Sequence, residues 1–173
     1  MILTGNEIRK QVLNNRINIS PFIEENVNPN SYNYRLGEFL LEIEDGEIDS
    51  RKKVIYKKIK LSDDGYMLQP KKLYLGSTVE EIGSDYYVTQ LIGRSSVGRL
   101  GLFLQITASL GHFGSKHCWT LELKAVQPVR VYPNMKIGQV SFWTMNGSKD
   151  IEYEGKYQRY SMPHVSEFYK ELY

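Results

Sequence analysis

The sequence predicts an all-β domain with a short helix at each end, and three observations support this prediction. Between Tyr32 and Trp143 the chain is a series of short β-prone segments separated by Gly, Pro, Asp and Asn, a spacing typical of sandwiches and barrels. A length of 173 residues with 41% hydrophobic content suffices for one core rather than two. No apolar run of about eighteen residues occurs, so we expect no membrane-spanning segment.

The amino-terminal segment, residues 1–20, predicts a capped helix. Thr4 and Glu7 have the spacing of a capping box, in which the Thr hydroxyl accepts a backbone N–H and the Glu reaches back to the cap. A helix of about ten residues should follow. Ile8 and Val12 should share its buried face. The helix should end near residues 14–15, where two Asn side chains compete for backbone hydrogen bonds.

The β core is predicted to span residues 32–143. Its expected strands are FLLEIE, KVIYKKIKL, KLYLGSTVEEI, YYVTQLI, LFLQITASL, CWTLELKAV, VRVYP and KIGQVSFW. Alternation is clearest over residues 118–125, where Trp119, Leu121, Leu123 and Ala125 share one face. Glu122 therefore points to the other, polar face.

Residues 153–173 follow the last strand and are expected to form a closing tail that ends in a short helix capped by Ser166. We thus read residues 1–173 as a single domain. The net charge of +2 gives no reason to expect a nucleic-acid partner. The basic run 51–60 alternates with apolar residues, as a strand with one solvated face would. The one cysteine, Cys118, excludes an internal disulfide, and together with the absence of a signal-peptide pattern this favours a cytoplasmic location.

The segment from Gly93 to Arg99 (GRSSVGR) is the most unusual local sequence. Arg94 and Arg99 offer forked donors, Ser95 and Ser96 offer hydroxyls, and the flanking glycines allow close backbone approach, which are the elements a phosphate group needs. The spacing is not that of a P-loop. Considered alone, this segment is better explained as a basic surface turn than as a phosphate site.

Two further segments could carry chemistry. Glu122 is a candidate general acid and base, although a carboxylate on a polar strand face is more often solvated. Residues 153–160 concentrate aromatic rings, a glycine and two cations, which could fold over a planar charged ligand or pack on the protein surface. His112, His117 and Cys118 lack the cysteine spacing of zinc deaminases, and we expect no metal ligands in the protein.

Taken together, these segments resemble the dCTP deaminase family, within the superfamily that also contains dUTP diphosphatases. The resemblance runs from end to end in order and spacing. Its pieces are the MIL start with its capped helix, VNPNSYNYRLG at 27–37, GRSSVGRLGL at 93–102, TLEL at 120–123 and GKYQRYSMPHVS at 155–166.

The resemblance implies a distorted jelly-roll, or β-clip, fold like that of dUTPases, assembled as a homotrimer with active sites between subunits. The ligand would be a nucleoside triphosphate carrying Mg²⁺. Glu122 would be the general acid and base, Ser95 and Arg99 would assist catalysis, and Arg99 would reach a neighbour's site. The substrate-binding residues would be Arg94, Ser96, Thr107, Ala108, His112, Tyr153, Lys156, Gln158 and Tyr160.

The sequence departs from the family pattern between Ala108 and Thr120. His112 stands where the family has an Asp that binds the sugar hydroxyl and, in diphosphatases, activates water; Tyr160 stands where a tail Gln reads the base. An imidazole is a weaker acceptor than a carboxylate for this purpose. The leading expectation is hydrolytic deamination of dCTP, or of a related cytosine nucleotide, to dUTP and ammonia without a catalytic metal. A dUTP diphosphatase or nucleotide pyrophosphatase and a catalytically silent nucleotide-binding trimer remain alternatives.

Overall fold

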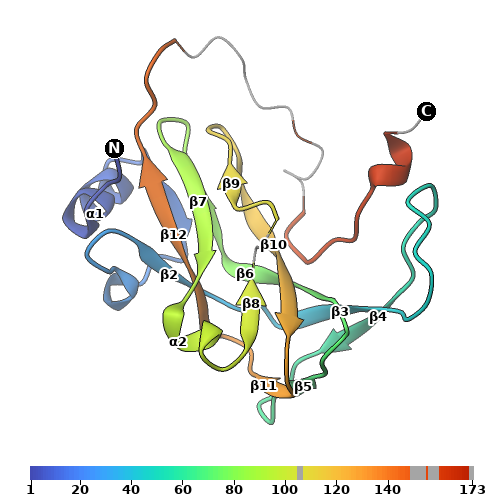
Figure 1. Ribbon diagram of the computed structural model, residues 1–173. Coiled ribbons are helices and arrows are strands. Elements are labelled where there is room, and N and C mark those ends of the chain that lie inside the picture. Colours follow the sequence, from blue (N-terminus) through green and yellow to red (C-terminus); the bar gives the residue numbers. More distant parts are fainter. Residues whose placement is uncertain (105–106, 149–154, 156–159, 172–173) are drawn as a thin grey trace.

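A computed structural model describes residues 1–104, 107–148, 155 and 160–171 (Figure 1). Its helical elements are α1 (Gly5–Leu13), η1 (Glu24–Asn26), α2 (Ser95–Gly98) and η3 (Phe168–Lys170). Its strands are β1 (Asn18–Ser20), β2 (Tyr32–Arg35), β3 (Phe39–Ile43), β4 (Tyr56–Lys60), β5 (Tyr66–Leu68), β6 (Tyr74–Gly83), β7 (Val88–Gly93), β8 (Leu102–Leu104), β9 (Leu110–Gly111), β10 (Lys116–Ala125), β11 (Val129–Val131) and β12 (Lys136–Trp143). The predicted all-β class is confirmed.

The strands form two main antiparallel sheets and one small one. The larger sheet has the order β4-β3-β6-β10-β8, with β1 also paired to β6, and the second sheet has the order β2-β12-β7-β9. A two-stranded sheet, β11-β5, lies at one end (Figure 1). Side chains from both main sheets meet in one buried cluster that includes Tyr34, Ile82, Leu91, Leu121 and Phe142. The core therefore lies between two packed sheets, as in a sandwich.

The predicted amino-terminal helix is α1, and its start is set by the expected cap. The Thr4 hydroxyl accepts from the Glu7 backbone N–H at 3.3 Å. The Glu7 carboxylate accepts from Gln11 Nε2 at 2.5 Å, one turn further along the helix, rather than reaching back to the cap. Ile8 is fully buried and Val12 packs against the core, as the helical spacing predicts.

Three expected elements differ from prediction. The strand expected at 53–61 begins only at Tyr56, because Ile55 is exposed and Val54 packs on a small second cluster. The segment 102–110 forms two strands, β8 and β9, which belong to different sheets. The terminal helix is a single 3₁₀ turn, in which the Ser166 hydroxyl accepts from Phe168 N at 3.2 Å.

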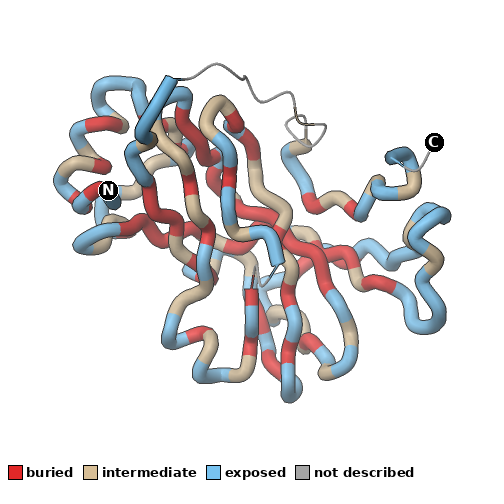
Figure 2. The backbone as a smooth tube through the Cα atoms, turned by 45° about the horizontal axis from the view of Figure 1, so that its top comes forward, coloured by how far each residue is buried: buried red, intermediate tan, exposed pale blue. Residues whose placement is uncertain are grey.

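Residues 160–171, which we call the strap, dock on the outer face of the larger sheet. Val165 is buried in the second cluster with Leu41, Ile43 and Leu75. Pro163 is buried as well, and Figure 2 shows buried points of the strap between exposed stretches. In the described part of the chain no helix is long and apolar enough to cross a membrane.

Candidate active site

Strand β10 presents the candidate catalytic residue at the surface of the larger sheet. Leu121, Leu123 and Ala125 are buried in the core, so Glu122 points to the opposite face, as the alternation predicts. Glu122 is partly buried and is paired in register with Leu75 of β6. Thr120 and Lys124 lie on the same face of β10, so this strand carries a hydroxyl, a carboxylate and an ammonium in a row.

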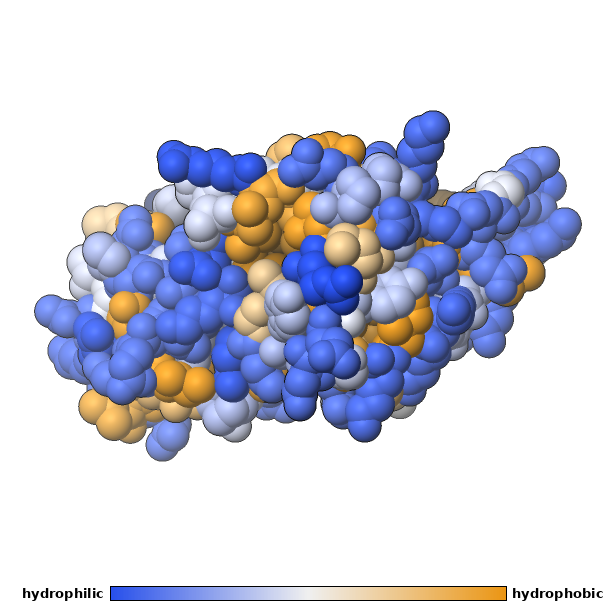
Figure 3. Space-filling view, turned by 90° about the horizontal axis from the view of Figure 1, so that it is seen from below, coloured by the Kyte–Doolittle hydropathy of each residue, from blue (hydrophilic) through white to orange (hydrophobic). Residues whose placement is uncertain are grey.

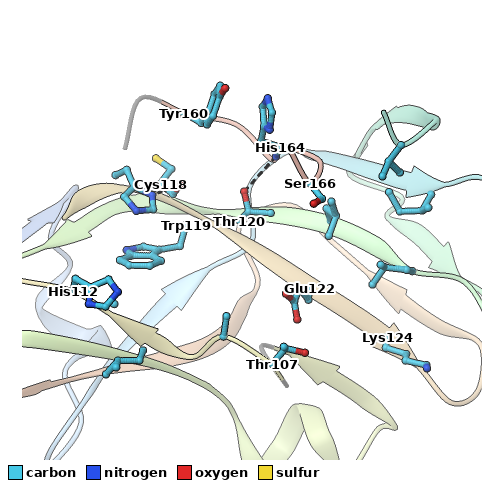
Figure 4. A pocket seen from close by; sticks show the side chains of 18 of the residues that line it. Thr107, His112, Cys118, Trp119, Thr120, Glu122, Lys124, Tyr160, His164 and Ser166 are labelled. Atoms are coloured by element: carbon cyan, nitrogen blue, oxygen red, sulfur yellow. Dashed lines mark hydrogen bonds between the residues drawn. The ribbon is translucent and has the colours of Figure 1, made fainter. Parts of the chain in front are cut away.

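These three side chains line a cavity of about 850 Å³, within the range of small-molecule sites. Figure 4 shows Thr107 and His112 on one side of β10 and Tyr160, His164 and Ser166 on the other. The remaining described lining residues are mostly apolar or small: Ile43, Ile48, Val54, Leu73, Leu75, Ala108, Leu110, Gly111, His117, Cys118 and Trp119. Among all these lining residues, Glu122 is the one carboxylate and Lys124 the one primary ammonium.

Trp119 lines the cavity at a point where the pairing of β10 is irregular. The pairing with β6 shifts between Cys118 and Thr120, and the Trp119 backbone N–H donates to the Thr78 hydroxyl at 2.9 Å. Its indole N–H donates to the Ile82 carbonyl at 3.0 Å. The Trp119 ring nevertheless packs against the core cluster that holds Leu121 and Leu123, so the predicted alternation holds at Trp119.

His117 and Cys118 are held as structural groups beside the cavity. The His117 ring packs on Trp119 with centroids 4.2 Å apart, and its Nδ1 lies 3.1 Å from the Cys118 carbonyl oxygen. Burial lowers the pKa of His117 and raises the pKa of the Cys118 thiol. The ring is therefore neutral and the sulfur protonated at neutral pH. In the described part of the chain no group of three or more His, Cys, Asp or Glu residues could hold a metal ion.

The GRSSVGR segment forms α2 and does not line this cavity. Arg94 donates from Nη1 to the Lys136 carbonyl at 2.9 Å within the same chain. Ser95, Ser96 and Arg99 are exposed, while Val97 is buried and anchors the turn. The segment that we considered as a phosphate site is thus exposed on the surface of the chain.

The structure therefore brings together some of the expected site residues. Glu122, Thr107, Ala108, His112 and Tyr160 share one cavity. Arg94, Ser95, Ser96 and Arg99 lie outside its lining. Tyr153, Lys156 and Gln158 fall outside the described residues.

Five polar lining residues were not anticipated, namely Thr120, Lys124, Trp119, His164 and Ser166. The alternation that places Glu122 also places Thr120 and Lys124, and that signal was available in the sequence. Nothing local in the sequence shows that His164 and Ser166 return to β10.

Comparison with known proteins identifies the family. A family model described as dCTP deaminase-like matches residues 2–145. The chain belongs to this family. A "dCTP deaminase, dUMP-forming" from Hathewaya histolytica is 47% identical over 158 residues, which are 91% of each chain. One of the same description from Clostridium beijerinckii is 45% identical over 172 residues, covering 99% of each chain.

A solved structure supports the fold of the family. The crystal structure of 2'-deoxycytidine 5'-triphosphate deaminase from Agrobacterium tumefaciens matches with a TM-score of 0.65 at 18% identity, over 82% of this chain and 47% of that chain. At this identity the match concerns the fold alone. The expected dUTPase-like β fold is confirmed.

Proposed function

We propose that this protein is a nucleotide hydrolase that deaminates dCTP in the cavity over β10, with Glu122 carrying the protons. The observation that supports this most is the position of Glu122, the one carboxylate among the described lining residues. Glu122 occurs in a chain whose sequence is 47% identical, over 158 residues, to that of a protein named "dCTP deaminase, dUMP-forming". A carboxylate set among apolar residues at a cavity wall is suited to proton transfer.

The proposed step adds one water to the cytosine ring and releases ammonia. Glu122 takes one proton from the water as its oxygen bonds to C4 and gives this proton to the ring N3; it then takes the remaining proton from the new C4 hydroxyl and gives it to the departing amino group. The C4–N4 bond then breaks, so dCTP and water give dUTP and ammonia. Thr120 and Lys124 supply a hydroxyl and a fixed positive charge on the same strand face, where developing charge needs preorganised donors.

For the final product we propose dUMP rather than the dUTP expected from the sequence. The relatives are named dUMP-forming, which favours deamination and diphosphate cleavage in one protein. A second water must then attack the α-phosphorus, and the bond to the bridging oxygen breaks to release pyrophosphate. His112, which replaces the family's Asp, is the titratable cavity group at the corresponding position of the chain.

Mg²⁺ fits this site as an ion carried by the substrate. The described residues offer no carboxylate cluster for it, whereas Mg²⁺ commonly binds through substrate phosphates and keeps several waters. Bound in that way it would neutralise phosphate charge, and no protein ligand among the described residues is required.

We further propose that the active site is completed in a homotrimer. Of the described lining residues only Lys124 is a lysine or arginine, too little charge for a triphosphate, while Ser95, Ser96 and Arg99 project from the surface. Leu100, Phe103 and Val126 near this turn are 53%, 44% and 61% exposed. Apolar patches are visible on the face shown in Figure 3. A neighbouring copy that covers such apolar surface could bring these phosphate-binding groups to the cavity.

A product assay tests the proposed function. The protein is incubated with Mg²⁺ and each common nucleoside triphosphate, and ammonia and pyrophosphate are assayed separately. Both products from dCTP are expected. Pyrophosphate without ammonia would support the diphosphatase alternative, and saturable binding with neither product would support the silent nucleotide-binding trimer.

A further inference from the structure

The strap is tied to the sheet at two adjacent points beside Glu122. The His164 backbone N–H donates to the Thr120 hydroxyl at 3.3 Å (Figure 4). The next residue, Val165, is buried in the second hydrophobic cluster. These contacts hold the backbone of the strap on β10, two residues from the candidate catalytic carboxylate.

A cluster of side chains on the strap fixes the two rings that border the cavity, and we call it the latch. It consists of Tyr160, His164, Glu167 and Lys170. The Tyr160 and His164 rings are stacked, with centroids 3.8 Å apart and planes at 21°. Figure 4 shows the two rings side by side above β10.

Glu167 is the centre of the latch. Its Oε1 accepts from Lys170 Nζ at 2.5 Å and from the Tyr160 hydroxyl at 3.5 Å, and lies 3.9 Å from His164 Nε2. Its side chain is only 12% exposed. The hydrogen bond from Lys170 holds the pKa of the Glu167 carboxyl below its usual value, so this group is ionised at neutral pH.

The orientation of the His164 ring is set by its own backbone neighbour. Its Nδ1 lies 2.7 Å from the Val165 carbonyl oxygen. A carbonyl oxygen only accepts, so Nδ1 carries the hydrogen and Nε2 is the nitrogen directed toward Glu167. The ring cannot turn without losing this bond, and it presents a fixed face to Tyr160.

We propose that Glu167 is a positioning residue that acts through Tyr160 and His164 and sets how tightly the cavity holds its nucleotide. Both rings line the cavity, whereas Glu167 does not. Removal of the carboxylate takes away the acceptor shared by Lys170 and the Tyr160 hydroxyl, so Glu167 no longer holds the stacked rings. The effect on nucleotide binding rests on the proposed function, whereas the role of Glu167 in the latch rests on its contacts with Lys170, Tyr160 and His164.

Hydrogen exchange tests the latch without relying on catalysis. Exchange of the His164 amide is compared in wild type, Glu167→Ala and Glu167→Gln. The matched control is Glu25→Gln, an exposed carboxylate in η1, which packs against β2 of the other sheet. We expect roughly tenfold faster exchange in Glu167→Ala, a smaller change in Glu167→Gln, whose amide oxygen still accepts, and none in the control. Wild-type exchange in Glu167→Ala would overturn the proposal.

The kinetic arm separates positioning from a purely structural role. With dCTP and Mg²⁺, Glu167→Ala should raise KM about tenfold while kcat stays within about twofold of the wild-type value. The KM of Glu167→Gln should lie much closer to that of wild type. A fall in kcat with unchanged KM would contradict positioning. Thermal melting of each variant confirms that it is folded. If wild type releases no ammonia, the proposed function fails, and the exchange arm still decides whether Glu167 holds the strap.

Discussion

The backbone N–H of His164 donates to the side-chain oxygen of Thr120, and this contact joins the carboxy-terminal strap to the strand that carries Glu122. Because Thr120 and Glu122 share one face of β10, a side chain that lines the cavity also anchors the strap. Docking of the strap is therefore physically linked to the lining of the cavity.

Replacement of Thr120 tests this link. Thr120→Val keeps the shape of the side chain but leaves the His164 N–H without its acceptor, which should weaken docking by about 1 kcal/mol. Hydrogen exchange in the peptide 160–171 should accelerate accordingly. Thr120→Ser retains the hydroxyl and should behave as wild type; equal exchange in the Val and Ser variants would show that this bond does not hold the strap.

A site shared between subunits predicts complementation. Arg99→Ala and Glu122→Gln should each be inactive alone, because one lacks a phosphate contact and the other lacks the proton carrier. In a mixed trimer some sites combine Glu122 of one chain with Arg99 of its neighbour, so an equal mixture should recover about a quarter of the wild-type ammonia release. A mixture of Glu122→Gln with Glu122→Ala is the control. If ammonia release recovers in neither mixture, either Glu122 and Arg99 of the same chain form one site, or Arg99 takes no part in the site.

The change His112→Asp tests the departure from the family pattern. A carboxylate accepts a hydrogen bond from a sugar hydroxyl more strongly than an imidazole does. In a Glu122→Gln background, which prevents turnover, calorimetry should show dCTP binding roughly fivefold more tightly. His112→Asn, which adds no charge, should not tighten binding. An unchanged Kd in the Asp variant would count against sugar recognition at this position.

Burial of His117 predicts that stability depends on pH. Its pKa in the folded protein lies below the ordinary 6.5, so the unfolded chain binds the proton more readily. The stabilisation that depends on a neutral His117 ring is fully present above pH 6.5. As pH falls from 6.5 toward the folded pKa, the free energy of unfolding decreases by at most about 1.4 kcal/mol per pH unit. Denaturant unfolding at pH 7.5 and 5.5 measures it. In His117→Phe, which keeps a ring against Trp119, this part of the pH dependence should disappear.

Much of the fold could be predicted because it depends on local pattern. The Thr4 cap placed the start of α1, and period-two alternation placed Leu121 and Leu123 in the core and Glu122 outside it. Asn33, in the VNPNSYNYRLG segment, has a structural role: it donates to Asn28 Oδ1 at 3.1 Å and accepts from Gln139 Nε2 at 3.3 Å.

Other features could not be predicted because they depend on tertiary contacts. The irregular pairing beside Trp119, whose backbone N–H donates to the Thr78 hydroxyl, involves a strand 41 residues away in sequence. β8 joins the larger sheet and β9 the second one, and this difference depends on strand pairing between distant parts of the chain rather than on local pattern. His164 reaches β10 through its backbone N–H, a group that every residue but proline carries, so its sequence context gives no signal.

The most direct test of the account compares wild type with Glu122→Gln at equal concentration, with dCTP and Mg²⁺, by measuring ammonia. Glutamine has nearly the same shape but cannot accept and return the proton. We expect ammonia release to fall by at least about a hundredfold, as for loss of a general acid and base, while calorimetry still detects dCTP binding. Ammonia release at the wild-type rate from Glu122→Gln would contradict the assignment of catalysis to this carboxylate.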